Sequence, residues 1–286
     1  MLAWMLYFKE GAIYNKRYIE FYMEEGRKLG ITVKLMLVEE LEFGVKEGEW
    51  FLTHKGAVLP YPDFVICRAI YPLLSKHLEA MGIRVFNNAI LSEICNDKAK
   101  TYQYLAKTGI RMVDTSFCKN SFLKAAMDHI PLPTVIKAVD GHGGRQVFLL
   151  DKNSEEEEKI RILRGIGSSD AVLQPLTGHK HQDLRVYVIG KEIIAAVLRT
   201  AKDGFRSNFS LGGEVRLYEL SEGERKLVHR IISQFEIGMV GIDFIIGDEG
   251  ELIFNEIEDV VGSRMLYQCS EINLVENYLS YILTQI

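Results

Sequence analysis

Three carboxylates near the C-terminus, Asp243, Glu256 and Glu258, stand in two runs of mostly apolar residues. The runs, residues 240–246 and 251–258, are rich in β-branched and aromatic side chains, and a short Gly-Asp-Glu-Gly turn joins them. This pattern predicts an antiparallel β-hairpin. Carboxylates clustered among apolar strands are costly unless a cation neutralises them, and hard oxygen ligands suit Mg²⁺ or Mn²⁺. The hairpin is therefore a candidate metal site.

The alternation of side chains along a strand decides which of these groups can meet. Glu256 and Glu258 should share one face of their strand, with Asn255 and Ile257 on the other face. If Asp243 on the partner strand projects toward the first face, the three carboxylates converge. The alternative is a solvated sheet face that carries acidic residues and no ligand.

A lysine and a glycine-rich connector form a second candidate site. Lys137 lies inside the apolar run 134–139, and Gly141, Gly143 and Gly144 follow it closely. Glycines let backbone amides approach phosphate oxygens, so the stretch is suited to bind a phosphate. It lacks the ending of a Walker loop and does not open a helix as a dinucleotide-binding fingerprint must. Without a ligand, the lysine would reach to the sheet edge and the glycines would make a hairpin turn.

Two further stretches carry cations where ligands often bind. Arg68 ends the strand-like run 64–68, and ligands of α/β proteins usually lie beyond the carboxyl ends of strands. It is a candidate contact for an anionic substrate. Residues 200–213 form a long polar loop that includes Arg206 and Asn208, and loops of this length in compact domains are often functional. The alternative for each arginine is an ordinary surface position.

Composition narrows the class of protein. The 286 residues are 48% hydrophobic and 26% charged, which is ordinary for a globular protein. A net charge of -5 argues against sequence-independent binding to nucleic acid. The four cysteines are scattered without metal or disulfide spacing, and the apolar N-terminus is too short for a signal or membrane segment. We therefore expect a cytoplasmic protein that binds neither nucleic acid nor membrane.

The hydrophobic periodicity predicts the elements that must position these residues. Alternating strand and helix patterns up to about residue 94 predict an α/β layer with a parallel sheet. Expected strands are 2–8, 32–38, 64–68, 83–86, 115–117, 134–139, 146–150, 171–174, 184–189, 192–199 and 214–217. Expected helices are 14–29, 73–81, 98–107, 121–127, 154–163, 222–235 and 271–283. A further hairpin is expected from 51–52 and 57–59 around a turn at 53–56.

The ordered set of motifs resembles the ATP-grasp superfamily, and within it the RimK-like carboxylate–amine ligases. The resemblance covers nearly the whole chain and is strongest from Phe64 to Arg264. The matching motifs are Asp97-Lys98, Lys137, Gly141–Gly144, Asp183-Leu184-Arg185, Arg206-Ser207-Asn208, Asp243 and Glu256. The implied fold class is α/β, or α+β when the whole chain is considered. In it, an N-terminal parallel α/β domain precedes an ATP-grasp fold.

That resemblance implies three domains and a role for each candidate residue. The domains would be an N-terminal α/β domain at 1–95, a small lid domain at 96–175 and a metal and nucleotide domain at 176–286. The implied ATP-binding residues are Lys98, Lys137, Gly141, Gly143, Gly144, Gln174, Pro175, Leu176, Asp183, Arg185 and Asn208. The implied ligands of Mg²⁺ or Mn²⁺ are Asp243, Glu256 and Glu258. Arg206 and Arg264 would stabilise the charge that develops during catalysis.

The implied reaction joins a carboxylate to an amine. The carboxylate of an amino acid, peptide or protein attacks the γ-phosphorus of ATP, and an amine co-substrate captures the acyl phosphate, which releases ADP and phosphate. Two rivals remain: a nucleotide-binding structural or regulatory protein without turnover, and an ATP-grasp kinase or carboxylase-type enzyme. Homo-oligomer formation is left open.

Two departures from the family pattern bear on the substrate. Many relatives have asparagine where this chain has Glu258, and a small-residue segment with proline follows it there. Here residues 259–264 read Asp-Val-Val-Gly-Ser-Arg instead. Because that segment lines the acceptor side in relatives, the resemblance does not imply which substrates are joined.

Overall fold

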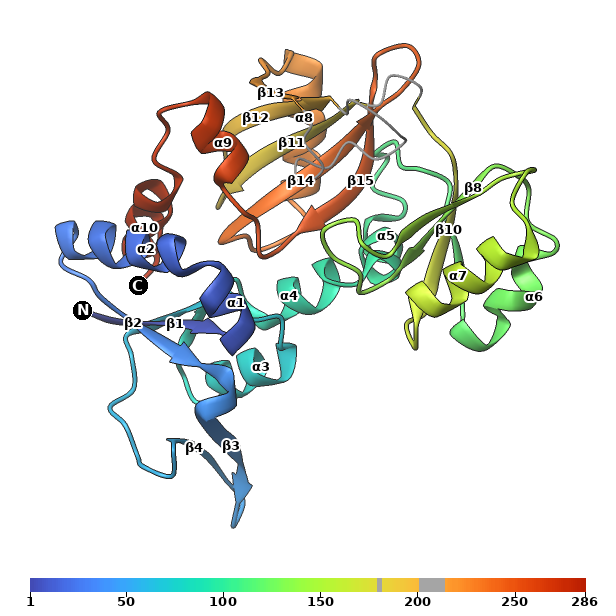
Figure 1. Ribbon diagram of the computed structural model, residues 1–286. Helices are drawn as coiled ribbons and strands as arrows, with labels where there is room; N and C mark the ends of the chain where they lie inside the picture. Colours follow the sequence, from blue (N-terminus) through green and yellow to red (C-terminus); the bar gives the residue numbers. More distant parts are fainter. Residues whose placement is uncertain (179–181, 201–213) are drawn as a thin grey trace.

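Three β-sheets organise the molecule, and a computed structural model describes residues 1–178, 182–200 and 214–286. The N-terminal part of the chain forms the first sheet, and the second sheet belongs to a separate lobe. The C-terminal part of the chain forms the third sheet, which lies between the other two in space (Figure 1). The expected ranges 1–95, 96–175 and 176–286 each hold one of these sheets. As folding units these ranges stay a prediction.

The N-terminal sheet is parallel, as expected, with the order β2-β1-β5-β6. Its strands are β1 (Leu2–Tyr7), β2 (Thr32–Leu37), β5 (Phe64–Cys67) and β6 (Arg84–Phe86). The helices of this part are α1 (Lys9–Tyr14), α2 (Lys16–Lys28), α3 (Pro72–Ala80) and α4 (Ala89–Cys95), with a 3₁₀ turn η1 (Val38–Glu40). The hydrophobic periodicity did not predict the short helices α1 and α4. A helix of six or seven residues is too short to show a repeating apolar pattern.

The hairpin expected around residues 53–56 is present only as a single antiparallel bridge between His54 and Ala57, not as paired strands. The strands that pair are β3 (Leu41–Lys46) and β4 (Glu49–His54), and the two-residue turn between them is Glu47-Gly48. Both turn residues have positive φ, 54° and 87°, which matches the twist that antiparallel strands require. The turn therefore lies six residues before the one expected.

The second sheet is antiparallel, with the order β7-β10-β8-β9. Its strands are β7 (Ser116–Cys118), β8 (Thr134–Ala138), β9 (Val147–Leu150) and β10 (Ala171–Pro175). Helices α6 (Leu123–Met127) and α7 (Glu156–Ile166) and a 3₁₀ turn η2 (Asn120–Phe122) cover one face and share a core with it. Helix α5 (Lys98–Leu105) precedes this lobe and packs against the third sheet through Tyr102. We call the lobe formed by the second sheet, α6 and α7 the lid lobe.

The third sheet has the order β13-β12-β11-β14-β15 and is antiparallel throughout. Its strands are β11 (Gln182–Ile189), β12 (Glu192–Thr200), β13 (Glu214–Leu217), β14 (Met239–Ile246) and β15 (Leu252–Glu258). The helices that follow or interrupt them are α8 (Glu222–Ile232), α9 (Arg264–Cys269) and α10 (Leu274–Gln285). The expected hairpin of β14 and β15 is confirmed.

One hydrophobic core joins the first and third sheets. It contains Met5 and Phe64 of the N-terminal sheet, Tyr187 and Met239 of the third sheet, and Leu279 of α10. Helix α10 lies beside α2, so the C-terminal end of the chain packs on the N-terminal layer (Figure 1). Among the described residues, no helix combines the length and apolarity needed to cross a membrane.

Asn87 is a further tie between these two sheets. Its side-chain amide donates to the Met239 carbonyl at 2.8 Å and to Asp259 Oδ1 at 2.6 Å. Its oxygen accepts from the backbone N–H groups of Gly238 and Met239, each at 2.8 Å. The side chain is 4% exposed, so water does not replace these partners.

Asn87→Ala should lower the free energy of unfolding by on the order of 3 kcal/mol, because several buried polar groups lose their partner at once. Denaturant unfolding followed by circular dichroism measures the loss. Asn153→Ala, at an exposed position in the lid lobe, is the control and should change stability by less than about 0.5 kcal/mol. Equal effects of the two substitutions would contradict the structural role of Asn87.

Candidate active site

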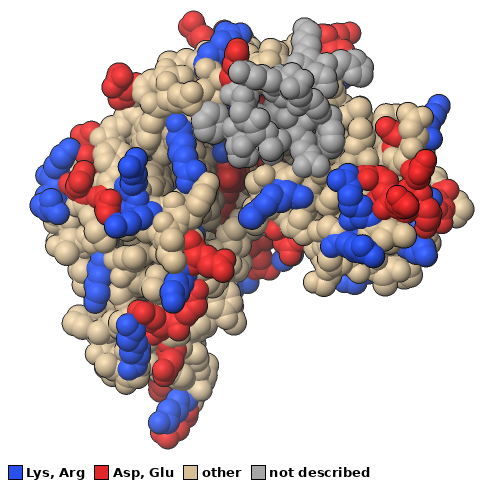
Figure 2. Space-filling view, in the orientation of Figure 1, with Lys and Arg blue, Asp and Glu red and all other residues tan. Residues whose placement is uncertain are grey.

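A pocket opens between the lid lobe and the third sheet. It encloses about 1170 Å³, part of which is open to solvent. Figure 2 shows acidic and basic side chains together in the hollow between the two lobes. The predicted site residues that line the pocket are Lys98, Lys137, Gly141, Gly143, Gly144, Gln174, Pro175, Leu176, Asp183, Glu256 and Glu258. Residues from four separate stretches of the sequence are thus brought into one site.

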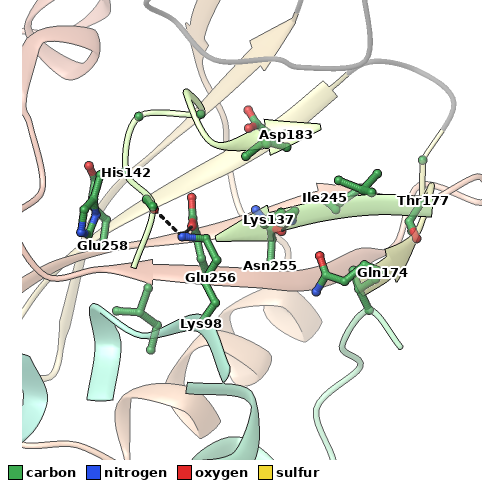
Figure 3. Close-up of a pocket in the computed structure, with 18 of the residues that line it drawn as sticks. Lys98, Lys137, His142, Gln174, Thr177, Asp183, Ile245, Asn255, Glu256 and Glu258 are labelled. Carbon is green, nitrogen blue, oxygen red and sulfur yellow. Dashed lines mark hydrogen bonds and ion pairs between the residues drawn. The ribbon is translucent and has the colours of Figure 1, made fainter. Parts of the chain in front are cut away.

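Lys98 is placed by the start of α5. Asp97 caps this helix as expected, since its Oδ1 accepts from the Lys100 N–H at 3.0 Å. The backbone N–H of Lys98 donates to Val139 O at 2.9 Å, which ties the helix to the end of β8. The Lys98 ammonium donates to Gly141 O at 2.6 Å and lies 3.3 Å from Glu256 Oε2 (Figure 3). The lysine therefore bridges the glycine connector and the acidic hairpin.

Lys137 projects from β8 into the pocket. Its ammonium donates to Asn255 Oδ1 at 2.8 Å (Figure 3). Burial lowers the pKa of Lys137 to about 8, while the charge of Glu256 opposes that shift and the charge of Lys98 adds to it. A buried lysine with one neutral partner is short of negative charge. An anion entering the pocket would supply it.

A β-bulge in the acidic hairpin corrects one expectation from strand alternation. The register shifts after Asp243, so that Asp243 pairs with Glu256 and Phe244 pairs with Phe254. Asn255 is the extra residue, and it lines the pocket together with Glu256. Strict alternation had placed Asn255 on the opposite face. The bulge instead aims its amide at Lys137.

The glycine-rich connector joins β8 to β9 as an antiparallel hairpin, as expected. Gly143 and Gly144 have φ values of +64° and +71°, a region that side chains rarely tolerate. A Cβ on Gly141 would lie 3.3 Å from the Ala138 carbonyl oxygen, closer than side chains usually come. The connector thus needs glycine at all three positions that were singled out from the sequence. His142 between them also lines the pocket, and burial lowers the pKa of its imidazole.

The far end of the pocket is more apolar. Val113, Val135 and Ile245 line it beside the end of β10. The Gln174 amide donates to Thr115 Oγ1 at 2.8 Å, so its side chain supports the strand. The backbone N–H of Leu176 points to Pro133 O at 3.4 Å, the weak end of the hydrogen-bond range. This end offers apolar walls and backbone groups to a planar ligand.

Below the pocket, charged side chains of the third sheet form a continuous row. Arg199 on β12 donates to both oxygens of Asp183, and its Nη2 also lies 2.9 Å from Asp243 Oδ2. Arg185 on β11 binds Asp243 with two hydrogen bonds of 2.7 Å and forms an ion pair with Glu258. We call these five residues the ion-pair row.

The row sets the ionisation of the acidic hairpin. Burial alone would raise the pKa of Asp243, but Arg185 and Arg199 hold it below its usual range. Burial is the largest influence on Glu256 and would raise its pKa, but the charges of Lys98, Lys137 and Arg185 together lower it. Glu258 differs, since burial raises its pKa despite the charge of Arg185. Asp243 and Glu256 are therefore stably ionised, and Glu258 is the carboxylate that an added cation would stabilise.

Sequence reasoning missed Arg199. The only signal was an arginine inside the apolar run 192–199. Its meaning depends on the strand register, which sets Arg199 opposite Asp183 and one strand from Asp243. A register of this kind cannot be read from one strand alone.

The predicted metal ligands lie together but are engaged by the chain's own cations. No three His, Cys, Asp or Glu side chains are arranged to hold an ion in the ranges 1–178, 182–200 and 214–286. Both oxygens of Asp243 accept from arginine, and Glu256 lies beside Lys98. Oxygen donors suit Mg²⁺, and burial raises the pKa of Glu258 although it pairs with Arg185, so a further cation beside it would favour its ionised form. The residues thus fit a divalent ion, and the ligand set stays a prediction.

The remaining predicted residues lie apart from the pocket or outside the described ranges. Arg264 begins α9 and donates to the Tyr14 hydroxyl at 2.7 Å, with its guanidinium over the Tyr14 ring. Arg68 donates to the backbone carbonyl of Val261 at 2.9 Å. Arg206 and Asn208 belong to residues 201–213, which lie outside the described part of the chain.

The chain matches one protein family, named relatives within curated proteins, and solved structures of similar fold. The RimK-like ATP-grasp domain family matches residues 95–282. A protein from Legionella pneumophila named probable alpha-L-glutamate ligase is 30% identical over 236 residues, which is 79% of this chain and 78% of that protein. A protein of the same name from Enterobacter is 26% identical over 285 residues, or 96% of this chain and 93% of that one.

Among solved structures, a crystal structure of the D-cycloserine synthetase DcsG superposes with a TM-score of 0.74 at 15% identity. The match covers 100% of this chain and 99% of that one. At this identity the likeness shows a shared fold. Together with the family match, this likeness identifies the arrangement of one parallel and two large antiparallel sheets as the ATP-grasp fold that the sequence predicted.

Arg199→Gln should lower the free energy of unfolding by about 3 kcal/mol, because the buried carboxylates of Asp183 and Asp243 each lose a cationic partner. Denaturant unfolding at pH 7 provides the measurement. Arg216→Gln, at an exposed position on the neighbouring β13, is the matched control and should shift stability by about 0.5 kcal/mol or less. A loss no larger than the control's would show that the row does not stabilise the sheet.

Proposed function

The chain belongs to the RimK-like ATP-grasp family of ATP-dependent carboxylate–amine ligases, and we propose that it forms an amide bond on an amino acid or peptide. It is a ligase by this membership. The observation that carries the assignment of the site is the meeting of Lys98, Lys137 and Glu256 in one pocket with the glycine connector. Lys98, Lys137 and Glu256 lie 39 to 158 positions apart in the sequence, and each has the chemistry that phosphates or their counter-ions require.

In the proposed complex, ATP lies with its phosphates toward Lys98 and Lys137. The glycine connector covers the phosphates with its backbone amides and excludes water. The adenine takes the apolar end, beside the backbone of Gln174, Pro175 and Leu176. The ribose lies toward Asp183, with Arg185 below it. Residues 201–213 supply Arg206 and Asn208 to the phosphate side in this proposal.

A divalent ion, Mg²⁺ or Mn²⁺, would be held by Glu256, Glu258 and Asp243 and would supply neutralising charge beside the β- and γ-phosphates. The chain's own groups have distinct tasks. Arg185 and Arg199 keep Asp243 ionised and fix its orientation through three hydrogen bonds. Lys98 orients Glu256. The pocket therefore meets the triphosphate with its charges already in place.

The proposed reaction proceeds in two steps. An oxygen of the substrate carboxylate bonds to the γ-phosphorus, the bond from that phosphorus to the β–γ bridging oxygen breaks, and ADP leaves. The amine nitrogen then bonds to the acyl carbon, phosphate leaves, and the nitrogen gives up a proton. Lys98 and Lys137 hold the phosphate oxygens throughout. Arg206 is proposed to stabilise the charge of both transition states, and Arg264 would share this role only if its guanidinium left Tyr14 and reached the pocket.

The substrate and setting are proposed from the relatives. Two relatives are named probable alpha-L-glutamate ligases, so glutamate is the first amine co-substrate to test, with amino acids, peptides and proteins as carboxylate donors. We also propose a cytoplasmic protein that acts without nucleic acid or membrane. Homo-oligomer formation stays a prediction.

A turnover screen tests the proposal. The protein, ATP and Mg²⁺ are incubated with pairs of amino acids and short peptides, and products are read by mass alongside ADP and phosphate release. Amide product with equimolar phosphate is expected, and hydroxylamine should trap the acyl phosphate as a hydroxamate. Nucleotide binding without phosphate release across the screen favours a regulatory protein. A stable phosphorylated product favours a kinase.

Glu256→Gln should reduce ATP-dependent product formation by more than about a hundredfold, because the amide cannot supply the negative charge that a metal-bound phosphate requires. The rate is measured by phosphate release with the fold checked by circular dichroism. Glu249→Gln, in the exposed turn of the same hairpin, is the control and should keep the wild-type rate. Near-normal turnover by a folded Glu256→Gln variant would contradict the assignment of Glu256 as a metal ligand.

Nucleotide affinity should fall as the pH rises through about 8, because Lys137 loses its proton there. If binding needs the charged lysine, the affinity drops by up to roughly tenfold between pH 8 and 9. Titration calorimetry with ADP measures it. The Lys137→Arg variant keeps its charge over this range and should show a flatter profile. Parallel profiles for the two proteins would contradict the role of Lys137.

A further inference from the structure

A cluster of polar side chains without partners lies outside the nucleotide pocket, where the N-terminal sheet meets the third sheet. It consists of Arg68, which follows β5, Tyr7 at the end of β1, and Tyr18 and Tyr22 on α2. The backbone N–H of Arg68 donates to Leu6 O at 2.9 Å, so Arg68 and Tyr7 lie at the same carboxyl edge of the parallel sheet. Ligands of α/β sheets usually bind at this edge. We call these four residues the Arg68 cluster.

The three tyrosines of the cluster lie around the guanidinium of Arg68. The Arg68 guanidinium carbon lies 5.4 Å from the centre of the Tyr18 ring, and the Tyr18 and Tyr22 rings meet edge to face at 5.1 Å. After burial, Tyr7, Tyr18 and Tyr22 are the groups that most affect the pKa of Arg68, which is raised. Arg68 and Tyr18 are partly exposed, whereas Tyr7 and Tyr22 are 3% and 0% exposed. The cluster is therefore partly exposed at Arg68 and Tyr18, while its unpaired polar atoms are buried.

The polar atoms of the cluster are unsatisfied. Within the described residues, the hydroxyls of Tyr7, Tyr18 and Tyr22 and Nε of Arg68 have no hydrogen-bond partner of acceptable geometry, although Tyr7 and Arg68, and Tyr18 and Tyr22, lie within interaction range of each other. Buried donors in folded proteins almost always have a partner, so four orphans around one cation need an explanation. A structural role explains them poorly, because phenylalanine would fill the same volume without an unpaired hydroxyl.

The charge of the cluster is also unbalanced. Arg185 and Arg199 each bind carboxylates. Arg68 makes no ion pair with any of the described residues, and its Nη2 donates only to the carbonyls of Val260 and Val261. A cation ringed by hydroxyl donors lacks an acceptor anion. A carboxylate fits, because its two oxygens can accept from the guanidinium and the hydroxyls together.

The cluster borders the acceptor side of the reaction. Val260 and Val261 follow the acidic strand β15 by two and three residues, and their carbonyls accept from Arg68 Nη2. The side chain of Val261 packs at Gly241, which also adjoins Arg185. A carboxylate held by Arg68 would thus lie beside this segment, outside the pocket that Lys98 and Lys137 line. Pairing with a guanidinium would also lower its nucleophilicity, so it is not the group that becomes phosphorylated.

We propose that the Arg68 cluster binds the unreacting carboxylate of an amino-acid substrate and so selects amino acids over amines that lack this group. The inference rests on the proposed ligase function, because it places that reaction's amino-acid substrate. The carboxylate accepts from Arg68 and from the hydroxyls of Tyr7, Tyr18 and Tyr22. The body of the amino acid then extends past Val261 toward the phosphates.

Thermal denaturation in the presence of ADP and Mg²⁺ tests the proposal with the twenty L-amino acids and their primary amides as probes. At least one acid should raise the Tm of the wild type by several degrees while its amide does not. Arg68→Gln should abolish that shift, and Arg27→Gln, an exposed arginine on α2, should keep it. Any of four results would overturn the proposal. The Tm could rise with acid and amide alike, rise with inorganic phosphate only, rise with no acid, or rise in Arg68→Gln as much as in the wild type.

Tyr22→Phe keeps the test decisive if Arg68→Gln fails to fold. Its Tm without amino acid should equal or exceed that of the wild type, because an unpaired buried hydroxyl is removed, yet the shift caused by the amino acid should shrink. A lower starting Tm with a full shift would show a structural role and overturn the proposal.

Kinetics separate this inference from the proposed function. In Arg68→Gln the KM for the amino acid should rise at least tenfold while the KM for ATP stays within twofold. Amide formation with an unchanged amino-acid KM overturns the inference and leaves the ligase assignment standing. Loss of the carboxylate-dependent Tm shift in a chain that releases no phosphate supports the binding site and overturns the ligase assignment.

Discussion

The buried carboxylate of Asp243, held between Arg185 and Arg199, is the interaction on which the rest of the site depends. Three charge-assisted hydrogen bonds of 2.7 to 2.9 Å fix its orientation. A buried charge without such partners would be protonated or would destabilise the fold. Because the two arginines come from different strands, the same bonds also hold β11, β12 and β14 in register. Site geometry and sheet stability therefore share one set of contacts.

The charges of the site balance as a whole. Asp183, Asp243, Glu256 and Glu258 face Lys98, Lys137, Arg185 and Arg199, so the formal charges cancel when all eight groups are ionised. The cations are divided between two parts of the molecule, since Lys137 belongs to strand β8 of the lid lobe, whereas Arg185 and Arg199 belong to strands β11 and β12 of the third sheet. An anionic triphosphate with a divalent ion can enter such a site without leaving a large excess of either charge. Its binding would also strengthen the contact between the lid lobe and the sheet.

The sequence predicted those parts of the fold and site that local patterns control. The parallel sheet, the β14–β15 hairpin and the cap at Asp97 follow from periodicity, turn chemistry and capping, and Lys98, Lys137 and the glycines meet in the pocket as the motifs implied. Arg199 escaped because its role depends on the pairing of three strands. Asn255 was assigned to the wrong face of its strand, because a one-residue bulge reverses the direction of a side chain and the neighbouring residues carry no pattern that predicts a bulge. The Arg68 cluster depends on contacts between segments far apart in the chain, and only the tertiary fold brings them together.

Transfer of ¹⁸O from the substrate carboxylate tests the proposed chemistry most directly. An amino-acid or peptide substrate is labelled with ¹⁸O in its carboxylate and incubated with the protein, ATP, Mg²⁺ and the amine, and the released phosphate is analysed by mass spectrometry. Ligation through an acyl phosphate predicts one ¹⁸O atom in each phosphate released, because the carboxylate oxygen that attacks the γ-phosphorus leaves with it. Amide formation or ATP hydrolysis with no ¹⁸O in the phosphate would contradict that chemistry.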